Sequence, residues 1–164
     1  MSVQTIYEDV RKHVGRSFRR DLGRMRSIDL QRFAVAVGDD LPITMDAEVA
    51  AAAGLPDIAA PPLFLSSVMG WEAGPSESEL LADGVPPDGL ANLPVSGLRL
   101  MGGGQALEFF QPVVAGTQIV QETLIKDVQL KEGRSGHLVL IQVERSFFCE
   151  HALLLRCVET FIGR

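Results

Sequence analysis

The sequence of 164 residues has only two cysteines, Cys149 and Cys157, and both lie in one apolar region near its end. They lack the paired spacing of a zinc site, and a chain of this length can bury a core without a disulfide scaffold. We therefore expect two reduced thiols in the core and no metal site.

Long apolar runs are also missing, since none approaches the roughly 18 residues of a membrane span. Glu8 and Asp9 stand where a signal peptide would need its apolar centre. The sequence therefore predicts a cytoplasmic protein.

Positive charge is scarce: fifteen Lys and Arg face twenty-one Asp and Glu, a net charge of -6. Only residues 16–26 concentrate basic side chains, so nucleic acid is an unfavoured partner. We interpret this stretch as the solvated face of a strand and its turn, with contact to a phosphate as the alternative.

Apolar residues make up 46% and charged residues 22%, as in an ordinary soluble domain. Length and composition predict one domain over residues 1–164. Apolar spacing of three and four residues predicts helices, the second of them ending at Gly38, and an almost wholly apolar segment before Trp71 predicts a buried helix. The predicted helices span residues 5–14, 27–37, 47–53 and 63–71.

Residues 74–94 are rich in Gly, Pro, Ser and Asp, which predicts a long loop that either covers a binding site or only decorates the fold. After it, β-branched residues and local alternation predict strands, with a hairpin over residues 131–136 and a corner at Glu150 and His151. The predicted strands span residues 95–100, 106–111, 117–130, 138–148 and 153–162.

Helices followed by antiparallel strands predict an α+β domain in which the sheet wraps the apolar helix at 63–71. Such a sheet has two open edges. We therefore expect a homodimer, or a heterodimer with a related chain, that covers an edge.

Two blocks of sequence carry a resemblance to a known family. The first is FAVAVGDDLPITMD at residues 33–46, followed by AAG at 52–54 and APPLF at 60–64, and the second is GGGQALEFFQP at 102–112. Residues 14–162 resemble the MaoC-like dehydratase and (R)-specific enoyl-CoA hydratase family, in its N-terminal-half branch. The resemblance implies a hotdog fold, an antiparallel sheet around a central apolar helix.

Catalytic members of that family add water to enoyl thioesters, or remove it from 3-hydroxyacyl thioesters, with the motif G-D-x-N-P-[IV]-H. Gly38 and Asp39 match it, but Leu41 replaces the Asn and Thr44 replaces the His. The chemistry needs one group to take a proton from water and another to deliver one to C2. Threonine has no pKa near neutrality, so half of this pair is missing.

Catalytic members also place His-Gly at the start of the buried helix, where a backbone N–H polarises the thioester oxygen. This sequence has Pro61 and Pro62 there, and proline has no N–H to donate. This part of an oxyanion hole is therefore lost.

The resemblance implies an acyl-thioester-binding subunit of an enoyl-CoA hydratase or 3-hydroxyacyl-thioester dehydratase, whose MaoC-type partner supplies most of the catalytic Asp and His. A homodimeric enzyme that uses Asp39, and a non-catalytic acyl-CoA-binding domain, are the alternatives. No cofactor is expected beyond the substrate, a coenzyme A or acyl-carrier thioester. The lack of a large basic face disfavours a carrier protein.

Candidate site residues follow from these patterns. Asp39 is either catalytic or a structural residue of its turn. The three glycines at 102–104 are either a bulge in an edge strand or a close approach to a pantetheine arm, and His137 belongs either to a solvated hairpin tip or to a contact with coenzyme A phosphates. Glu108 is expected to pair with an arginine such as Arg99. The substrate-binding candidates are Pro62, Phe64, Met69, Trp71, Gly102, Gly103, Gly104, Gln105, Lys131 and Arg134.

Overall fold

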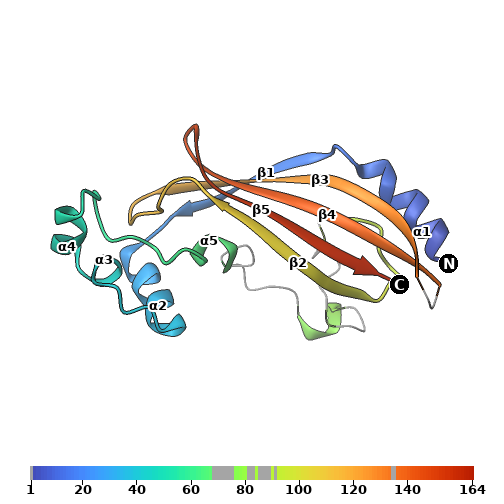
Figure 1. Cartoon of the computed structure of the whole chain (residues 1–164), viewed down its shortest axis with the longest axis horizontal. Coiled ribbons are helices and arrows are strands. Elements are labelled where there is room, and N and C mark those ends of the chain that lie inside the picture. The colour runs from blue at the N-terminus through green and yellow to red at the C-terminus, as the bar shows by residue number, and fades with distance from the viewer. Residues whose placement is uncertain (1, 68–75, 81–83, 85–89, 91, 134–135) are drawn as a thin grey trace.

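A long, curved antiparallel sheet of five strands forms the body of the molecule, with short helices at both of its ends (Figure 1). The computed structural model describes residues 2–67, 76–80, 84, 90, 92–133 and 136–164. The strand order is β1-β3-β4-β5-β2, so β1 and β2 are the two edges. The strands are β1 (Ser17–Arg24), β2 (Leu100–Phe109), β3 (Gln118–Gly133), β4 (Gly136–Cys149) and β5 (Ala152–Gly163).

Alternation decides which face of each strand is buried. In β4, Val139, Ile141 and Val143 are each fully buried, because side chains two residues apart point to the same face. The hairpin between β3 and β4 is confirmed, with Gly133 opposite Gly136. Four predicted strands and the strand in the basic stretch are therefore confirmed.

The predicted strand at 95–100 is wrong, because residues before Leu100 form turns. Val95 and Leu98 are buried, but a turn joins them, with the Leu98 N–H donating to the Val95 carbonyl at 3.0 Å. Apolar residues here fill the core from a loop, which the sequence pattern cannot separate from a short buried strand.

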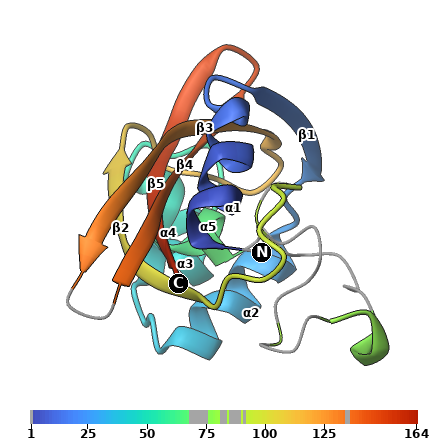
Figure 2. The same ribbon diagram turned by 90° about the vertical axis from the view of Figure 1, so that its right-hand side faces the viewer.

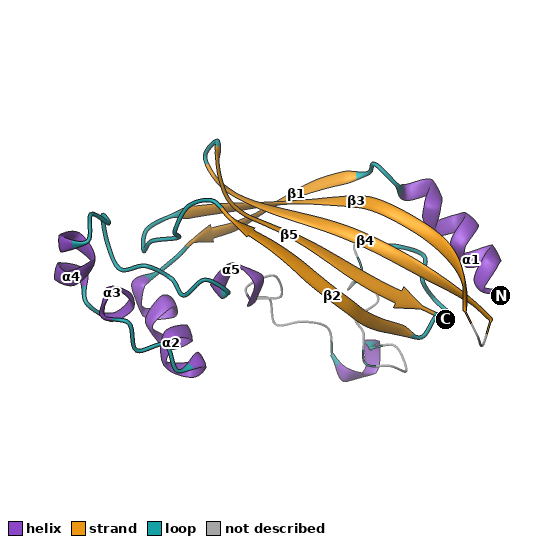
Figure 3. Ribbon diagram, in the orientation of Figure 1, coloured by secondary structure: helices purple, strands orange, loops and turns teal. Residues whose placement is uncertain are grey.

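Figure 3 shows the short helices in purple. Several of them begin or end at recognisable sequence signals. The Ser2 hydroxyl accepts from the Thr5 N–H at the start of α1, and Gly38 ends α2 in a left-handed conformation with φ of 73°. Asp46 caps α4, while α3 is a single turn that the sequence pattern did not predict. The helices are α1 (Val3–Val10), η1 (Arg11–His13), α2 (Ser27–Val37), α3 (Pro42–Met45), α4 (Ala47–Ala52), α5 (Phe64–Ser67) and η3 (Glu77–Glu79).

The buried side chains form two clusters, one toward each end of the sheet. In the first, Ile6 and Val10 of α1 pack on β3 and β4 (Figure 2). In the second, Leu30 of α2 and Phe64 of α5 pack against Phe147. Of the predicted apolar helix, α5 is described, and residues 68–71 lie outside the described residues, as does most of the predicted loop at 74–94.

Within the described ranges, no helix has both the length and the apolar character needed to span a bilayer.

Candidate functional site

A cavity of about 750 Å³ opens at the end of the sheet that carries α2, α3 and α4. Its wall comes from the turn between α2 and α3, the segment from Ala53 to Pro62, α5, the end of β2 with the residues after it, and the start of β5. Most of the lining side chains are apolar. The cavity therefore suits a hydrocarbon group.

Asp39 lies on the cavity wall because it directly follows Gly38, the C-cap of α2. The left-handed Gly38 reverses the chain, and the Asp39 N–H donates to the Ala34 carbonyl at 2.9 Å. The carboxylate Oδ1 accepts from the Leu41 N–H at 3.0 Å. The half-buried Asp39 thus fixes its own turn and also lies on the cavity wall. The structural interpretation is confirmed, and a catalytic role stays a prediction.

Thr44, which stands where catalytic relatives have histidine, also lines the cavity. Its side chain is 2% exposed, and its hydroxyl donates to the Leu41 carbonyl at 2.7 Å. Leu41 itself is 53% exposed on the same wall. The motif positions Asp39, Leu41 and Thr44 therefore meet at one cavity, but Asp39 is the single ionisable side chain among its described lining residues.

Pro61 and Pro62 line the cavity at the start of α5, where the Phe64 N–H donates to the Pro61 carbonyl at 3.0 Å. Neither proline offers an N–H to a ligand. Phe64 is fully buried and packs edge-on against Phe33, with ring centres 5.5 Å apart, so it belongs to the core behind the cavity.

The three glycines lie on the exposed edge strand β2, several residues before the part of β2 that reaches the cavity, and they do not line it. The register with β5 shifts between Gly102 and Gly104, and Gly104 has φ of 116°. A Cβ at Gly103 would come within 3.1 Å of Thr160 and Ile162. These features are those of a β-bulge.

Gln105 also lies away from the cavity, and its amide donates to Glu159 at 2.9 Å. Glu159 forms an ion pair with Arg145 on the inner face of the sheet, where both side chains are largely buried. Burial, the larger effect, raises the pKa of the neighbouring Cys157 thiol, and the Arg145 charge opposes it. Cys149 and Cys157 are free thiols.

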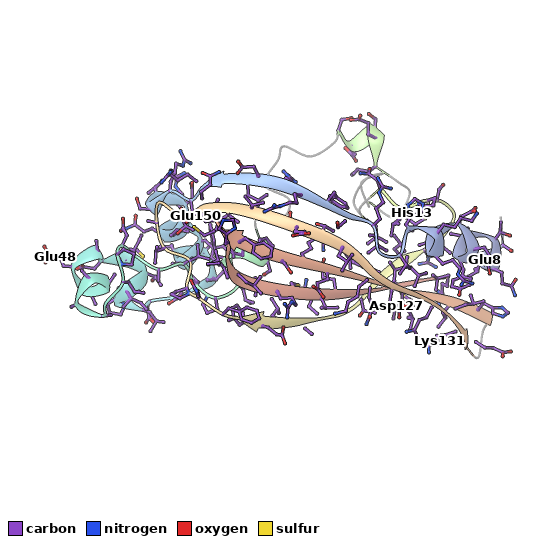
Figure 4. All side chains as sticks on the ribbon, turned by 90° about the horizontal axis from the view of Figure 1, so that it is seen from above. Glu8, His13, Glu48, Asp127, Lys131 and Glu150 are labelled. Atoms are coloured by element: carbon purple, nitrogen blue, oxygen red, sulfur yellow. The ribbon has the colours of Figure 1, made fainter. Side chains whose placement is uncertain are left out.

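Lys131 lies at the end of the sheet opposite the cavity, as its distance from Glu48 of α4 in Figure 4 makes plain. His137, beside it on β4, contacts the Gln4 amide at 3.3 to 3.4 Å. Met69, Trp71 and Arg134 lie outside the described residues.

The sequence pattern missed Phe109 and Phe110, which form part of the cavity wall and are 53% and 49% exposed. Two adjacent aromatic residues at the end of a strand break its alternation, which is the signal that could have identified them. Glu108 pairs with Arg156 at 2.8 Å, so the expected pairing with an arginine is confirmed. The partner is not Arg99, because the register places Arg156 directly opposite on β5. The Arg156 guanidinium also lies 5.4 Å from the centre of the Phe110 ring.

A curved antiparallel sheet with short helices and an apolar cavity at one end defines an α+β domain of the hotdog class. The ChsH1-ChsH2 complex from Mycobacterium tuberculosis has the same fold, with a TM-score of 0.74 and 16% identity over 97% of this chain and 89% of that chain. The truncated HadBC (3R-hydroxyacyl-ACP dehydratase) complex from the same organism gives a TM-score of 0.71 and 19% identity over 92% of this chain and 97% of that chain.

The sequence model of the protein family named FAS1-like, dehydratase domain region, matches residues 12–151 of this chain. The chain belongs to this family. A UPF0336 protein of Parafrankia sp. (strain EAN1pec) is 32% identical over 130 residues, which cover 77% of this chain and 76% of the relative. The resemblance to the MaoC-like dehydratases and the predicted hotdog fold are thereby confirmed.

Proposed function

We propose that the chain is the acyl-thioester-binding subunit of an enoyl-thioester hydratase or 3-hydroxyacyl-thioester dehydratase, and that a MaoC-type partner subunit supplies most of the acid and base chemistry. The substrate is a coenzyme A or acyl-carrier thioester, and the reaction needs no further cofactor. The family, which is that of a dehydratase region, supports the reaction class.

One observation supports assigning substrate binding to this chain and most of the catalysis to a partner subunit. Hydration of an enoyl thioester needs a proton acceptor and a proton donor that share one water. Among the described lining residues, only Asp39 ionises, and its carboxylate already accepts the Leu41 N–H. The Thr44 hydroxyl is directed to a backbone carbonyl. This cavity can hold an acyl group, but it holds half of an acid and base pair.

The exposed edges of the sheet support a partner subunit. The edge strand β2 runs toward the cavity and ends at Phe109. Phe109 and the next residue, Phe110, are half-exposed on the rim of the cavity. An exposed strand edge and exposed aromatic side chains favour association. Solved structures of similar fold include two complexes, ChsH1-ChsH2 and HadBC.

Reconstitution tests the proposal. The chain is mixed with a MaoC-type subunit that carries an intact G-D-x-N-P-[IV]-H motif, and hydration of trans-2-enoyl-CoA is followed by loss of its ultraviolet absorbance. We expect little activity from this chain alone and activity from the mixture. Light scattering at micromolar concentration should show a dimer. High activity of this chain alone would favour the homodimeric alternative, and thioester binding without turnover in every mixture would favour a non-catalytic domain.

Asp39→Asn separates a contributory role from an essential one. In the reconstituted complex, we expect the rate to fall by much less than the ~100-fold that is typical of losing a general acid or base. Asp40→Asn is the matched control, because Asp40 is exposed and is not part of the cavity wall. Replacing the partner's motif histidine should abolish activity. A loss of ~100-fold from Asp39→Asn in a folded chain would contradict the proposed division.

A further inference from the structure

Basic side chains are distributed very unevenly in this acidic protein. Residues 11–32 contain eight of the fifteen Lys and Arg but only two of the twenty-one Asp and Glu. This stretch therefore carries a net charge of +6, and the rest of the chain carries -12. A separation of this size creates a positive field on one part of the surface.

The fold places the first part of this stretch along one edge of the sheet. Residues 11–26 form η1 and the edge strand β1 and lead to the start of α2. In Figure 4 the strand runs lengthwise from the neighbourhood of the labelled His13 toward α2. We call residues 11–26 the basic edge.

Charge along the basic edge is only partly neutralised. Arg26 pairs with Asp29 and Lys12 with Asp9, both at 2.7 Å, and Arg11 lies 3.8 Å from Glu8. Arg24 donates to the Gly116 carbonyl. Arg16 contacts the His13 ring, and neither Arg16 nor Arg19 has a carboxylate within ion-pair distance in the described part of the chain.

Apolar side chains are exposed between these cations. Val14 is 45% exposed and Phe18 is 38% exposed. A surface that is merely solvated has no need of an exposed phenylalanine, whereas arginine together with an aromatic residue is typical of protein interfaces.

The dimensions and composition favour an acidic protein as the occupant. The eight residues of β1 extend for about 26 Å at roughly 3.3 Å per residue, which is much longer than the phosphates of one nucleotide. Seven of the eight cations between residues 11 and 32 are arginine, whose planar guanidinium group matches carboxylates in a bidentate manner. A row of Asp and Glu on a protein surface fits this edge.

Helix α2 connects the basic edge to the cavity. Its N-cap is Arg26, and Asp39 of the cavity wall follows its C-cap Gly38. The eleven residues of α2 span about 16 Å at 1.5 Å per residue, a distance that an extended phosphopantetheine arm can cover.

We propose that the basic edge is the docking surface for an acidic acyl carrier protein, which presents its thioester to the cavity past α2. The inference rests on the proposed function and names the carrier of its substrate. It reverses the expectation from composition, because the fold sets the basic stretch of the sequence along one edge of the sheet.

Binding can be measured without turnover, so that the docking surface and the proposed function are tested separately. The whole chain is titrated with a holo acyl carrier protein of a type II fatty-acid synthase at low ionic strength, and the dissociation constant is measured by calorimetry. We expect the double variant Arg16→Glu/Arg19→Glu to weaken binding by at least about tenfold and added salt to weaken binding to the unmodified chain. Arg99→Glu, an exposed arginine away from the basic edge, is the matched control and should have less than about twofold effect.

The neutral double variant Arg16→Gln/Arg19→Gln is used if the charge reversal harms folding. It should weaken carrier binding by less than the charge-reversal variant. No carrier binding at low salt, or an equal loss from Arg99→Glu, would overturn the proposal. Binding to phosphatidylserine vesicles in place of the carrier would also overturn it and assign the edge to a membrane surface. Carrier binding without reconstituted hydration would contradict the proposed function alone.

Discussion

The two ends of the sheet are built from the same strands but are finished differently. At the end that carries α1, Ile6 and Val10 are 1% and 0% exposed, and they close the core over β3 and β4. At the end that carries α2 to α4, Leu41, Phe109 and Phe110 remain about half-exposed around the cavity.

The difference shows how one sheet can serve stability and binding at once. The closed end buries Ile6 and Val10 almost completely, so these side chains contribute to folding. The open end leaves apolar surface uncovered, which costs stability unless a ligand or a partner covers it. We expect substitutions at the two ends to have different consequences.

The largest expected effect separates the ends by stability. Ile141→Ala removes a fully buried side chain from the closed end and should lower the free energy of unfolding by about 2–5 kcal/mol. Leu41→Ala at the open end should change it by no more than about 0.5 kcal/mol, because half of that side chain is already in water. Urea denaturation of the isolated chain measures both, and equal losses would remove the distinction.

The next effect tests what the open end binds. Ala60→Trp places an indole in the cavity and should weaken binding of a twelve-carbon acyl-CoA by about tenfold, or about 1.4 kcal/mol, while short acyl-CoA is affected less. Ala52→Trp, on the exposed surface of α4 and away from the cavity wall, is the matched control. If acyl-chain preference is unchanged in Ala60→Trp, the cavity does not hold the acyl group.

A smaller effect concerns the turn that carries Asp39. Gly38→Ala forces a side chain into the left-handed region and should cost about 1–2 kcal/mol, although a Cβ there would touch nothing within 4 Å. Gly102→Ala is the control, because Gly102 has equal space but no positive φ, and it should be nearly neutral. A thermal melt distinguishes the two, and a neutral Gly38→Ala would show that the turn tolerates another conformation.

The smallest effect compares the two thiols. The thiolate is the reactive form of cysteine. Because burial raises the pKa of Cys157 above that of an ordinary cysteine, a larger fraction of this thiol stays protonated at a given pH than in an exposed cysteine. The half-buried Cys149 should react first with a disulfide reagent at pH 8, and labelling of Cys157 should need higher pH or denaturant. Mass spectrometry of timed samples shows which thiol is labelled first. Earlier labelling of Cys157 would contradict the prediction.

The sequence predicted the strands and α2 well because their signals are local. Alternation of apolar and polar residues marks β4. The end of α2 is marked by Gly38, because a left-handed C-cap favours glycine. It failed at α3, a single turn with too few residues to show a period, and at residues 95–100, whose apolar side chains enter the core from turns.

The candidate site was predictable only in part, and for a related reason. The motif identified Asp39 and Thr44 because they are close in sequence, and the structure places both on the cavity wall. Phe109 and Leu155 meet there because of the register between β2 and β5, which no local pattern states. The glycines at 102–104 left a bulge and a ligand approach open by composition, and the structure shows the bulge of an edge strand.

The hydrogen bond from Thr44 to Leu41 has a consequence for how such a subunit could change over time. A histidine at this position would leave the Leu41 carbonyl without the hydroxyl that now donates to it. A single codon change would therefore destabilise the fold before it could restore any chemistry. Under the proposed function, this chain therefore stays dependent on a second gene product, and the two genes would be inherited and lost together.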